Sequence, residues 1–197
     1  MAPRTTPEVG GMGHSIKRKE DPRFIRGKGT YVDDVVLPGM LYMDIVRSPY
    51  AHAKILKIDT AAALKVPGVA AVITGETLAQ FKLHWMPTLM SDTQMVLPTE
   101  KVMYQAQEVA AVIATDRSAA ADGVAPVEVE YDPLPVIVDP YKSLEPGAQV
   151  LRTDKPDKKD NHMFHWEAGD RKATDSAFAS AEVTVKQDIY LPRIHVA

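Results

Sequence analysis

The sequence contains no cysteine in its 197 residues. Disulfide bonds, thiolate metal sites, Cys-ligated iron–sulfur clusters and a Cys nucleophile are therefore excluded within this chain. Long apolar runs are also missing, because no stretch approaches the roughly 20 residues that a membrane-spanning helix needs. The first residues, MAPRTTPEVGGMGHS, carry no apolar signal segment. We therefore expect a cytoplasmic protein without a membrane span.

A large excess of charge of either sign is missing as well. The chain has 23 Lys and Arg against 26 Asp and Glu, which gives a formal net charge of −3. This balance gives no reason to expect nucleic acid or an anionic membrane as a partner. Apolar residues make up 45% of the sequence. That share is enough for the core of one domain of ordinary size, or one and a fraction.

Turn and strand signals dominate the first half of the chain. Gly27 and Gly29 flank Lys28, so the backbone there is able to take a positive φ or make a close approach. Elsewhere apolar residues alternate with polar ones or gather in short dense runs, which predicts strands. The expected strands are residues 41–46, 53–58, 69–73, 102–104, 109–114, 127–131, 136–138 and 183–190.

Helix signals are brief. Asp116 is a good N-cap for a helix from 117 to about 122, which Gly123 and Pro126 should end. The other expected helical segments are an Ala-rich stretch between Thr60 and Pro67 and residues 76–82, 140–144 and 175–181. Short strands and helices without a regular βαβ rhythm predict an α+β fold with mixed strand pairing.

Composition also predicts a domain plan. Residues 1–16 hold Pro, Gly and few apolar groups, so we expect a mobile arm. Residues 17–144 should form the main domain and residues 145–160 a polar, Pro-interrupted linker, with a shorter segment over 161–197 after it. Trypsin should cut this linker first, at Arg152, Lys158 or Lys159, because few contacts would hold the backbone there.

Several residue groups invite a functional interpretation. His162, His165 and Glu167 lie close enough in sequence to suggest a metal site. Strand geometry puts positions i and i+3 on opposite faces, so we favour solvated or interface His. Gly27-Lys28-Gly29 lacks the further Gly and the Lys-Ser/Thr ending of a phosphate loop, so a structural turn is favoured. His52 has no identifiable nucleophile or orienting partner nearby and is expected to be packed or capping.

Two further groups have a structural interpretation. The carboxylate pairs Glu20-Asp21 and Asp33-Asp34 are expected to be caps or surface charges, because acid/base pairs normally converge across a pocket. Residues 83–98 carry two Pro and no clear period, which predicts a long loop. For the soft apolar residues in this loop, core packing is favoured and a subunit or domain interface is the alternative. These residues are His84, Trp85, Met86, Met90 and Met95.

A set of short motifs keeps its order along the first part of the chain. The motifs are Glu20-Asp21, Arg23-Phe24, Gly27-Lys28-Gly29, Tyr31 to Asp34, Leu37 to Leu41, Arg47 to Pro49, Ala51 to Ala53 and Pro67 to Val69. Together they resemble the start of the molybdenum-binding large subunit of the xanthine dehydrogenase and aerobic carbon monoxide dehydrogenase family. The strings 83–89, 105–110 and 161–170 are similar to the carbon monoxide dehydrogenase branch.

This resemblance implies an α/β hammerhead domain over roughly Gly27 to Val138, followed by the first elements of a cofactor-holding domain. The full-length family subunit would hold molybdenum on molybdopterin, and in the carbon monoxide branch a Cys would bind copper beside it. The implied holoenzyme oxidises carbon monoxide with water and passes electrons to iron–sulfur and flavin subunits. The cofactor loop, the base Glu and the copper-binding Cys have no match here, so no catalytic, cofactor-binding or metal residue is assigned.

The sequence leaves three functions open. The first is the N-terminal part of a molybdenum hydroxylase large subunit, with a structural and assembly role against the molybdenum-cofactor domain. The second is a separately encoded, non-catalytic module that completes a catalytic partner chain. The third is a truncated product without activity. A large exposed apolar patch would favour a domain that has a partner, whereas a free module should lack one.

Overall fold

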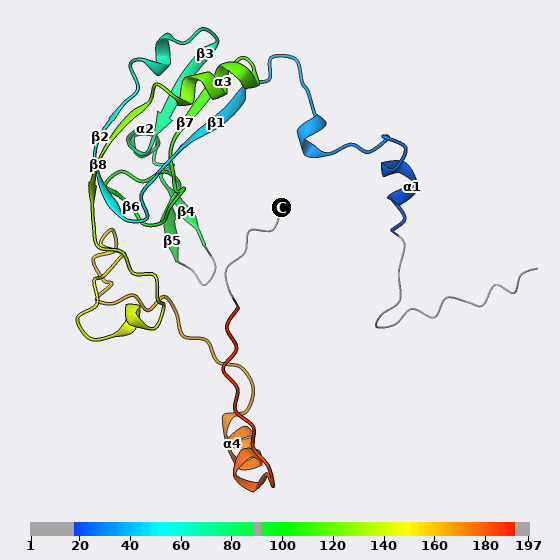
Figure 1. Ribbon diagram of the computed structural model, residues 1–197, viewed down its shortest axis with the longest axis vertical. Coiled ribbons are helices and arrows are strands. Elements are labelled where there is room, and N and C mark those ends of the chain that lie inside the picture. The colour runs from blue at the N-terminus through cyan, green and yellow to red at the C-terminus, as the bar shows by residue number, and fades with distance from the viewer. Residues whose placement is uncertain (1–17, 89–91, 192–197) are drawn as a thin grey trace, which may run out of the picture. The chain divides into compact units, whose positions relative to one another are not determined.

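The computed structural model describes residues 18–88 and 92–191 (Figure 1). The arm expected over 1–16 lies outside the described residues. The chain divides into two compact units. The first comprises the chain up to Pro87 and Thr93–Val136, and the second comprises Thr88–Asp92 and Ile137–Ala197. The domain boundaries expected from composition stay predictions.

The first unit is built on a three-stranded sheet with the order β1-β7-β3. Its strands are β1 (Tyr42–Arg47), β7 (Glu108–Ala114) and β3 (Val69–Thr74). The central strand β7 lies between the other two (Figure 1) and pairs antiparallel with both. Its nearly continuous apolar run fits this central place, and five of its seven residues are buried.

The second sheet has the order β6-β2-β8. It contains β6 (Lys101–Val102), β2 (Ala53–Asp59) and β8 (Glu128–Pro133), again paired antiparallel. Every pairing among the described residues is antiparallel, so the expected α+β class is confirmed but the expected mixed pairing is wrong. The sequence pattern of a strand does not reveal the direction of its partner, because both kinds of ladder use the same extended backbone with a period of two.

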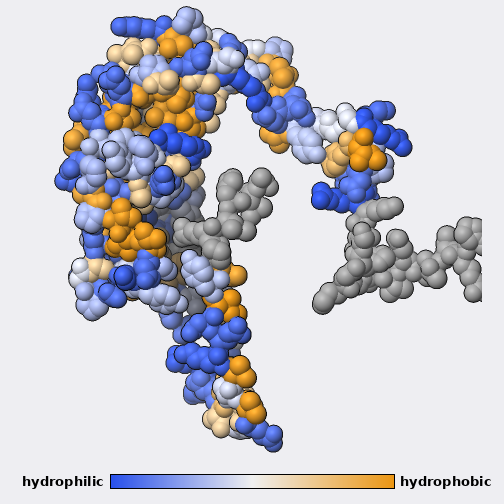
Figure 2. Space-filling view, in the orientation of Figure 1, coloured by the Kyte–Doolittle hydropathy of each residue, from blue (hydrophilic) through white to orange (hydrophobic). Residues whose placement is uncertain are grey.

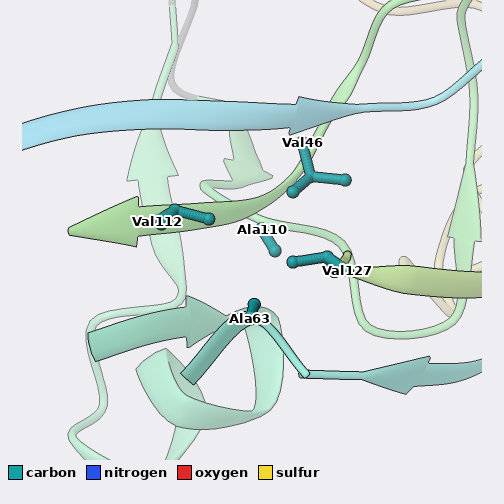
Figure 3. Close-up of a cluster of buried hydrophobic side chains, with 5 residues drawn as sticks. All are labelled: Val46, Ala63, Ala110, Val112 and Val127. Carbon is teal, nitrogen blue, oxygen red and sulfur yellow. The ribbon is translucent and has the colours of Figure 1, made fainter. Parts of the chain in front are cut away.

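The core of the first unit gathers small and branched residues. Val46, Ala63, Ala110, Val112 and Val127 are buried and point toward one another (Figure 3). A second buried cluster, formed by residues of β2, β6 and β7, consists of Ala53, Val102 and Val109. Because Ala and Val fill little space, the sheets and helices approach closely, and the core depends on tight packing rather than on large aromatic side chains.

Helix α3 (Arg117–Val124) lies directly on the first sheet. The Asp116 side chain accepts a hydrogen bond from the Ala119 amide at 2.9 Å, which confirms the predicted N-cap. The predicted end at Gly123 is wrong, because Gly123 is a buried position inside the helix. A Cβ atom there would stand 2.7 Å from methyl groups of both Val112 and Val69, so only glycine allows this approach of helix and sheet.

The remaining helical elements are short. They are α1 (Asp21–Phe24), η1 (Val32–Asp34), η2 (Ala63–Lys65), α2 (Gly75–Gln80), η4 (Lys142–Leu144) and α4 (Arg171–Ser180). The expected Ala-rich helix is a single 3-10 turn, η2, because Pro67 pushes Val66 into the extended region and leaves too little room. Helix α4 begins earlier than expected because Asp170 caps it, accepting a hydrogen bond from the Ala173 amide at 3.0 Å.

Three of the predicted segments differ from the structure in other ways. The loop expected over 83–98 contains a hairpin of β4 (Trp85–Pro87) and β5 (Thr93–Met95). Strands of three residues are too short to show a period in sequence, so the pattern was absent. The expected strands at 136–138 and 183–190 are not formed, since neither has a neighbouring strand among the described residues.

The expected turn at Gly27-Lys28-Gly29 is confirmed in both of its features. Gly27 has a φ of +66°, the left-handed conformation that favours glycine. At Gly29 a Cβ atom would stand 2.9 Å from the Phe24 ring, so this glycine provides the close approach. The Phe24 ring stacks on Tyr31 with 5.5 Å between the ring centroids, and together they fix the turn.

The second unit is held by polar side chains. Asn161 donates from Nδ2 to the carbonyl oxygens of Ser143 and Gln149 and accepts at Oδ1 from the Leu151 amide, over distances of 2.7–3.0 Å. The Asn161 side-chain amide thereby joins the backbone at Ser143, Gln149 and Leu151. These side-chain hydrogen bonds take the place of backbone pairing between β-strands in this segment. They order residues that composition predicts to be a polar linker.

Candidate interaction surfaces

The two sheets of the first unit present different outer faces. On the second sheet, Lys54 lies 3.7 Å from Asp132 and Lys57 lies 2.9 Å from Asp59. The hydrogen bond and charge of Asp59 raise the pKa of Lys57. Glu128 and Glu130 are exposed on the neighbouring strand β8. Paired charges of this kind favour water, so this face is suited to solvent.

The first sheet differs, because apolar residues occupy most positions on both of its faces. The first face carries Val46, Ala110 and Val112 and is buried in the core. The opposite face, which we call the apolar sheet face, contains two cross-strand rows of directly paired residues. They are Met43, Ile113 and Ala71 in one row and Ile45, Ala111 and Ile73 in the other.

The apolar sheet face is only partly covered. Met43 is 62% exposed, and Ile45, Ile73 and Ile113 are each partly exposed. An uncharged row of this composition on a sheet is unusual at a free surface and typical of an interface. Figure 2 shows hydrophobic residues reaching the surface of both units among hydrophilic ones. We therefore identify the apolar sheet face as the candidate docking site of the first unit.

Exposed large apolar residues are also frequent in the second unit. They gather after residue 162, on both sides of α4 and on the helix itself. The set consists of Met163, Phe164, Trp166, Phe178, Val183, Val185, Ile189, Tyr190 and Leu191, all exposed. None of the helices in the described residues is long and apolar enough to cross a membrane. A surface of this kind is more typical of a protein partner, because it follows the chain over nearly thirty residues.

The sequence-predicted candidates lie apart from one another. His52 is buried and its Nδ1 stands 2.7 Å from the Pro135 carbonyl oxygen, as expected of a packed histidine. His162 is exposed, and His165 is exposed with its Nε2 3.0 Å from Glu167. Across residues 18–88 and 92–191, no three His, Cys, Asp or Glu side chains form a group able to hold a metal ion.

The carboxylate pair Asp33-Asp34 has the two expected roles. The Asp34 side chain accepts a hydrogen bond from the Tyr31 amide at 2.9 Å and caps η1. Asp33 instead binds the Arg117 guanidinium through both oxygens, at 2.8 and 3.0 Å, and the hydrogen bonds and charge of Arg117 lower the pKa of Asp33. Because this pair is solvent-exposed, it orients η1 on α3 but stabilises the fold little.

The soft apolar cluster is partly at the surface, so the favoured core assignment is wrong for some of its members. Trp85 and Met86 are exposed on β4, and His84 and Met95 are half-buried. Met90 lies outside the described residues. The reason is that β4 and β5 form a separate two-stranded sheet with little around it to bury them. The interface alternative fits these residues.

The charge cluster around Arg152 was not predicted from the sequence. Arg152, Asp154 and Asp92 are only 11%, 12% and 16% exposed. Arg152 donates to Asp154 at 2.8 Å and to Asp92 at 3.3 Å. These contacts differ from the few contacts expected for the 145–160 segment, and the expected cleavage by trypsin stays a prediction. Local sequence patterns do not indicate this cluster, because Asp92 lies 60 residues from Arg152 in the sequence.

The Arg152 cluster predicts a pH dependence of the second unit. Burial raises the pKa of Asp154, but the hydrogen bonds and charge of Arg152 outweigh this and hold that pKa below its usual value. The resulting stability is fully present above the unfolded carboxyl pKa of about 3.9 and is lost as the pH falls through the lower folded pKa. Amide exchange in residues 143–161, corrected for intrinsic rates, should therefore accelerate below about pH 4.

Two variants separate this effect from general acid unfolding. Asp154→Asn should reduce protection of the segment at neutral pH and flatten its acid dependence. Asp175→Asn removes an exposed carboxylate that lies 3.7 Å from Arg171 and should leave both unchanged. An unaltered acid dependence in Asp154→Asn would contradict the assignment.

The donor set of the chain does not fit a copper–molybdenum site of the kind the family resemblance implies. With no cysteine, the chain has no thiolate for copper. Of the described histidines, His52 is buried against a carbonyl group, His84 is half-buried, and His162 and His165 are exposed. No chemical step is therefore derived through those groups on this chain.

Comparison with known proteins gives one family. The model described as "Aldehyde oxidase and xanthine dehydrogenase, a/b hammerhead domain" matches residues 26–135. The carbon monoxide dehydrogenase large chain of Hydrogenophaga pseudoflava is 55% identical over 196 residues, which cover 95% of this chain and 24% of that protein. The corresponding large chain of Afipia carboxidovorans is 53% identical over 194 residues, 94% of this chain and 24% of that protein.

A solved structure agrees. The crystal structure of the Cu,Mo-CO dehydrogenase in its carbon monoxide reduced state is 55% identical, with a TM-score of 0.75, over 88% of this chain and 23% of that chain. The chain thus spans about a quarter of the length of these relatives. The expected hammerhead fold and the expected carbon monoxide dehydrogenase resemblance are confirmed. By the match of residues 26–135, the chain belongs to the a/b hammerhead domain family of aldehyde oxidase and xanthine dehydrogenase.

Proposed function

We propose that this chain is the structural and assembly part of a molybdenum hydroxylase large subunit of the carbon monoxide dehydrogenase type. Its identity of 55% to the Hydrogenophaga pseudoflava large chain supports the type of enzyme. The matched part is 24% of that protein, so the remaining three quarters are available to carry the molybdenum cofactor and the chemistry. Iron–sulfur and flavin subunits would then receive the electrons.

The apolar sheet face carries this proposal. Burying a sheet face of Met43, Ile45, Ile73 and Ile113 stabilises a complex by roughly 25 cal/mol per Å² of apolar surface removed from water. Burying the charged outer face of the second sheet would give no comparable stabilisation, because its charges would have to leave water. The unit is therefore polarised, with one side for solvent and one for the cofactor-holding remainder of the subunit. The same face would serve a chain encoded separately from that remainder.

The test is reconstitution from two pieces. The chain is co-expressed with the Hydrogenophaga pseudoflava large chain that lacks the quarter matched here, and the complex is isolated through a tag on this chain. The two pieces should copurify. Met43→Asp should weaken the complex about tenfold or more, because it places a charge in the apolar row.

Leu56→Asp is the matched control. Leu56 lies on β2 in the second sheet and is 62% exposed, the same fraction as Met43. Both variants place an aspartate at an equally exposed apolar position of a strand, so the change in net charge is the same, yet binding should be unchanged for Leu56→Asp. No copurification of the unaltered chain, or equal weakening by the two variants, would contradict the proposed function.

A further inference from the structure

The segment between α1 and β1 is an exposed loop that is rich in apolar residues. We call residues 31–41, which include η1, the η1 loop. Its exposed large apolar residues are Tyr31, Val32, Val35, Val36, Leu37 and Leu41. Its backbone–backbone hydrogen bonds join residues three apart within the loop, for example the Met40 amide and the Leu37 carbonyl oxygen at 3.1 Å. Burial of its own apolar side chains therefore does not explain where this loop lies.

A charged side chain of α3 holds the η1 loop. Arg117 donates to both carboxylate oxygens of Asp33, at 2.8 and 3.0 Å, and to the Asp33 carbonyl oxygen at 3.1 Å. The Arg117 guanidinium also lies over the Tyr42 ring, 5.5 Å from its centroid. Because Tyr42 begins β1, these contacts connect the middle of the η1 loop to both the helix and the sheet.

A cavity of about 460 Å³ lies between the η1 loop, β1 and α3. The loop contributes Val32, Val35 and Leu41 to its lining, β1 contributes Met43, and α3 contributes Ala120. The walls are therefore largely apolar, and they come from three separate elements of the first unit.

The charged groups that line the cavity are already bonded within the chain. Asp33 and Arg117 bind each other, and the Asp44 carboxylate accepts a hydrogen bond from the Ile45 amide at 2.7 Å. A site for a small polar ligand presents polar groups that converge on the ligand and fix its orientation. With its charges satisfied in this way, the cavity is instead suited to an apolar side chain.

Met43 connects the cavity to the apolar sheet face. It lines the cavity, and it pairs with Ile113 in the first cross-strand row of that face. The candidate docking site thus continues from the sheet into the cavity. The relatives have about three quarters of their length outside the part matched by this chain. A chain that is able to fill the cavity therefore belongs to the same subunit in those proteins.

We propose that an apolar side chain of the cofactor-holding remainder enters this cavity, and that the Asp33–Arg117 pair holds the η1 loop closed over it. This inference rests on the proposed function and adds a contact on the other side of Met43. In the free chain water screens the pair, so the pair contributes little. In the complex the partner displaces that water, and a charge that has lost its counterpart then weakens binding.

The first experiment removes the ion pair in the two-piece complex described above. Asp33→Asn and Arg117→Met should each weaken the complex about tenfold, although they change the net charge in opposite directions. Both should keep the urea midpoint of the parent chain, because the pair is exposed in the free chain. The exchanged pair, Asp33→Arg with Arg117→Asp, should bind within about threefold of the parent, because opposite charges again face each other.

Asp132→Asn is the matched control for Asp33→Asn. It removes a carboxylate from another exposed ion pair, in which Asp132 lies 3.7 Å from Lys54 on the second sheet. That sheet presents its charged outer face to solvent in the proposed complex. Binding should therefore be unchanged, and a loss equal to that of Asp33→Asn would contradict the proposal.

The absence of cysteine from the chain allows a direct test of whether the cavity is filled. Val35→Cys places a thiol on the cavity wall, at a position that is 47% exposed in the free chain. Its reaction with a maleimide, followed by the mass of this chain, should slow about a hundredfold in the complex, because a covered thiol is not accessible. Leu56→Cys, on the outer face of the second sheet, should react equally fast in both states.

The outcomes separate the two proposals. A complex in which Val35→Cys reacts as fast as in the free chain overturns closure of the η1 loop and leaves the proposed function standing. The same holds if the exchanged pair binds no better than the single variants. Absence of any complex overturns the proposed function and this inference with it. Slow reaction of Val35→Cys already in the isolated chain assigns the cavity to the loop itself or to a second copy, and also overturns the inference.

Discussion

Gly123→Leu should unfold the first unit at much lower urea than the parent, with a loss of about 3 kcal/mol or more in unfolding free energy. The reason is the 2.7 Å that separates a Cβ at this position from methyl groups of Val112 and Val69. A leucine side chain would force α3 away from the sheet and expose the cluster of Ala114, Ala119 and Ala120. Urea titration followed by circular dichroism measures the loss.

Ala121→Leu is the control for this prediction. Ala121 lies on the exposed side of the same helix, two residues away, so the added side chain meets solvent. Its effect should stay within about 0.5 kcal/mol. Gly123→Ala should lie between the two, because alanine adds one clashing carbon but favours the helix by about 1 kcal/mol over glycine. Equal midpoints for the two leucine variants would show that α3 does not rest on the sheet.

Arg152→Ala should loosen the second unit by on the order of 3 kcal/mol, because it leaves the carboxylates of Asp92 and Asp154 largely buried without their cation. Amides of residues 143–161, which Asn161 holds together, should exchange roughly a hundredfold faster. Trypsin should then reach Lys158 and Lys159, whereas in the parent chain Lys158 donates to two carbonyl oxygens and is held in place.

Arg171→Ala provides the matched control. Arg171 also pairs with two carboxylates, Glu167 and Asp175, both at 3.7 Å, but its side chain is 81% exposed. Solvent screens such pairs, so the variant should change exchange rates by less than about a factor of five. If both arginine variants behaved alike, burial of the Arg152 cluster would have no energetic consequence and the assignment would be wrong.

Pattern and local chemistry predicted much of the fold. The strands β1, β2, β3, β7 and β8 follow from apolar alternation or dense apolar runs, and the α3 cap follows from Asp116. These features depend only on residues close in sequence. The family resemblance, which also rests on local motifs, identified the hammerhead fold.

The features that sequence reasoning missed depend on contacts between distant residues. Gly123 has the composition of a helix breaker, yet its role is to let α3 approach Val69 and Val112. Arg152 has the surroundings of a linker, yet it is buried by a carboxylate 60 residues away. The apolar sheet face was not identified because an inward and an outward apolar row have the same period in sequence.

The central place of β7 has a consequence for biosynthesis. β1 and β3 hydrogen-bond to β7 and not to each other. During synthesis, the strands over Tyr42–Arg47 and Val69–Thr74 must wait until Glu108–Ala114 has left the ribosome. Until then the backbone N–H and C=O groups of the two apolar strands lack their partners on β7. Closing the long connections between these strands and β7 also costs chain entropy. We therefore expect the nascent first unit to expose two apolar strands until its central strand has been translated.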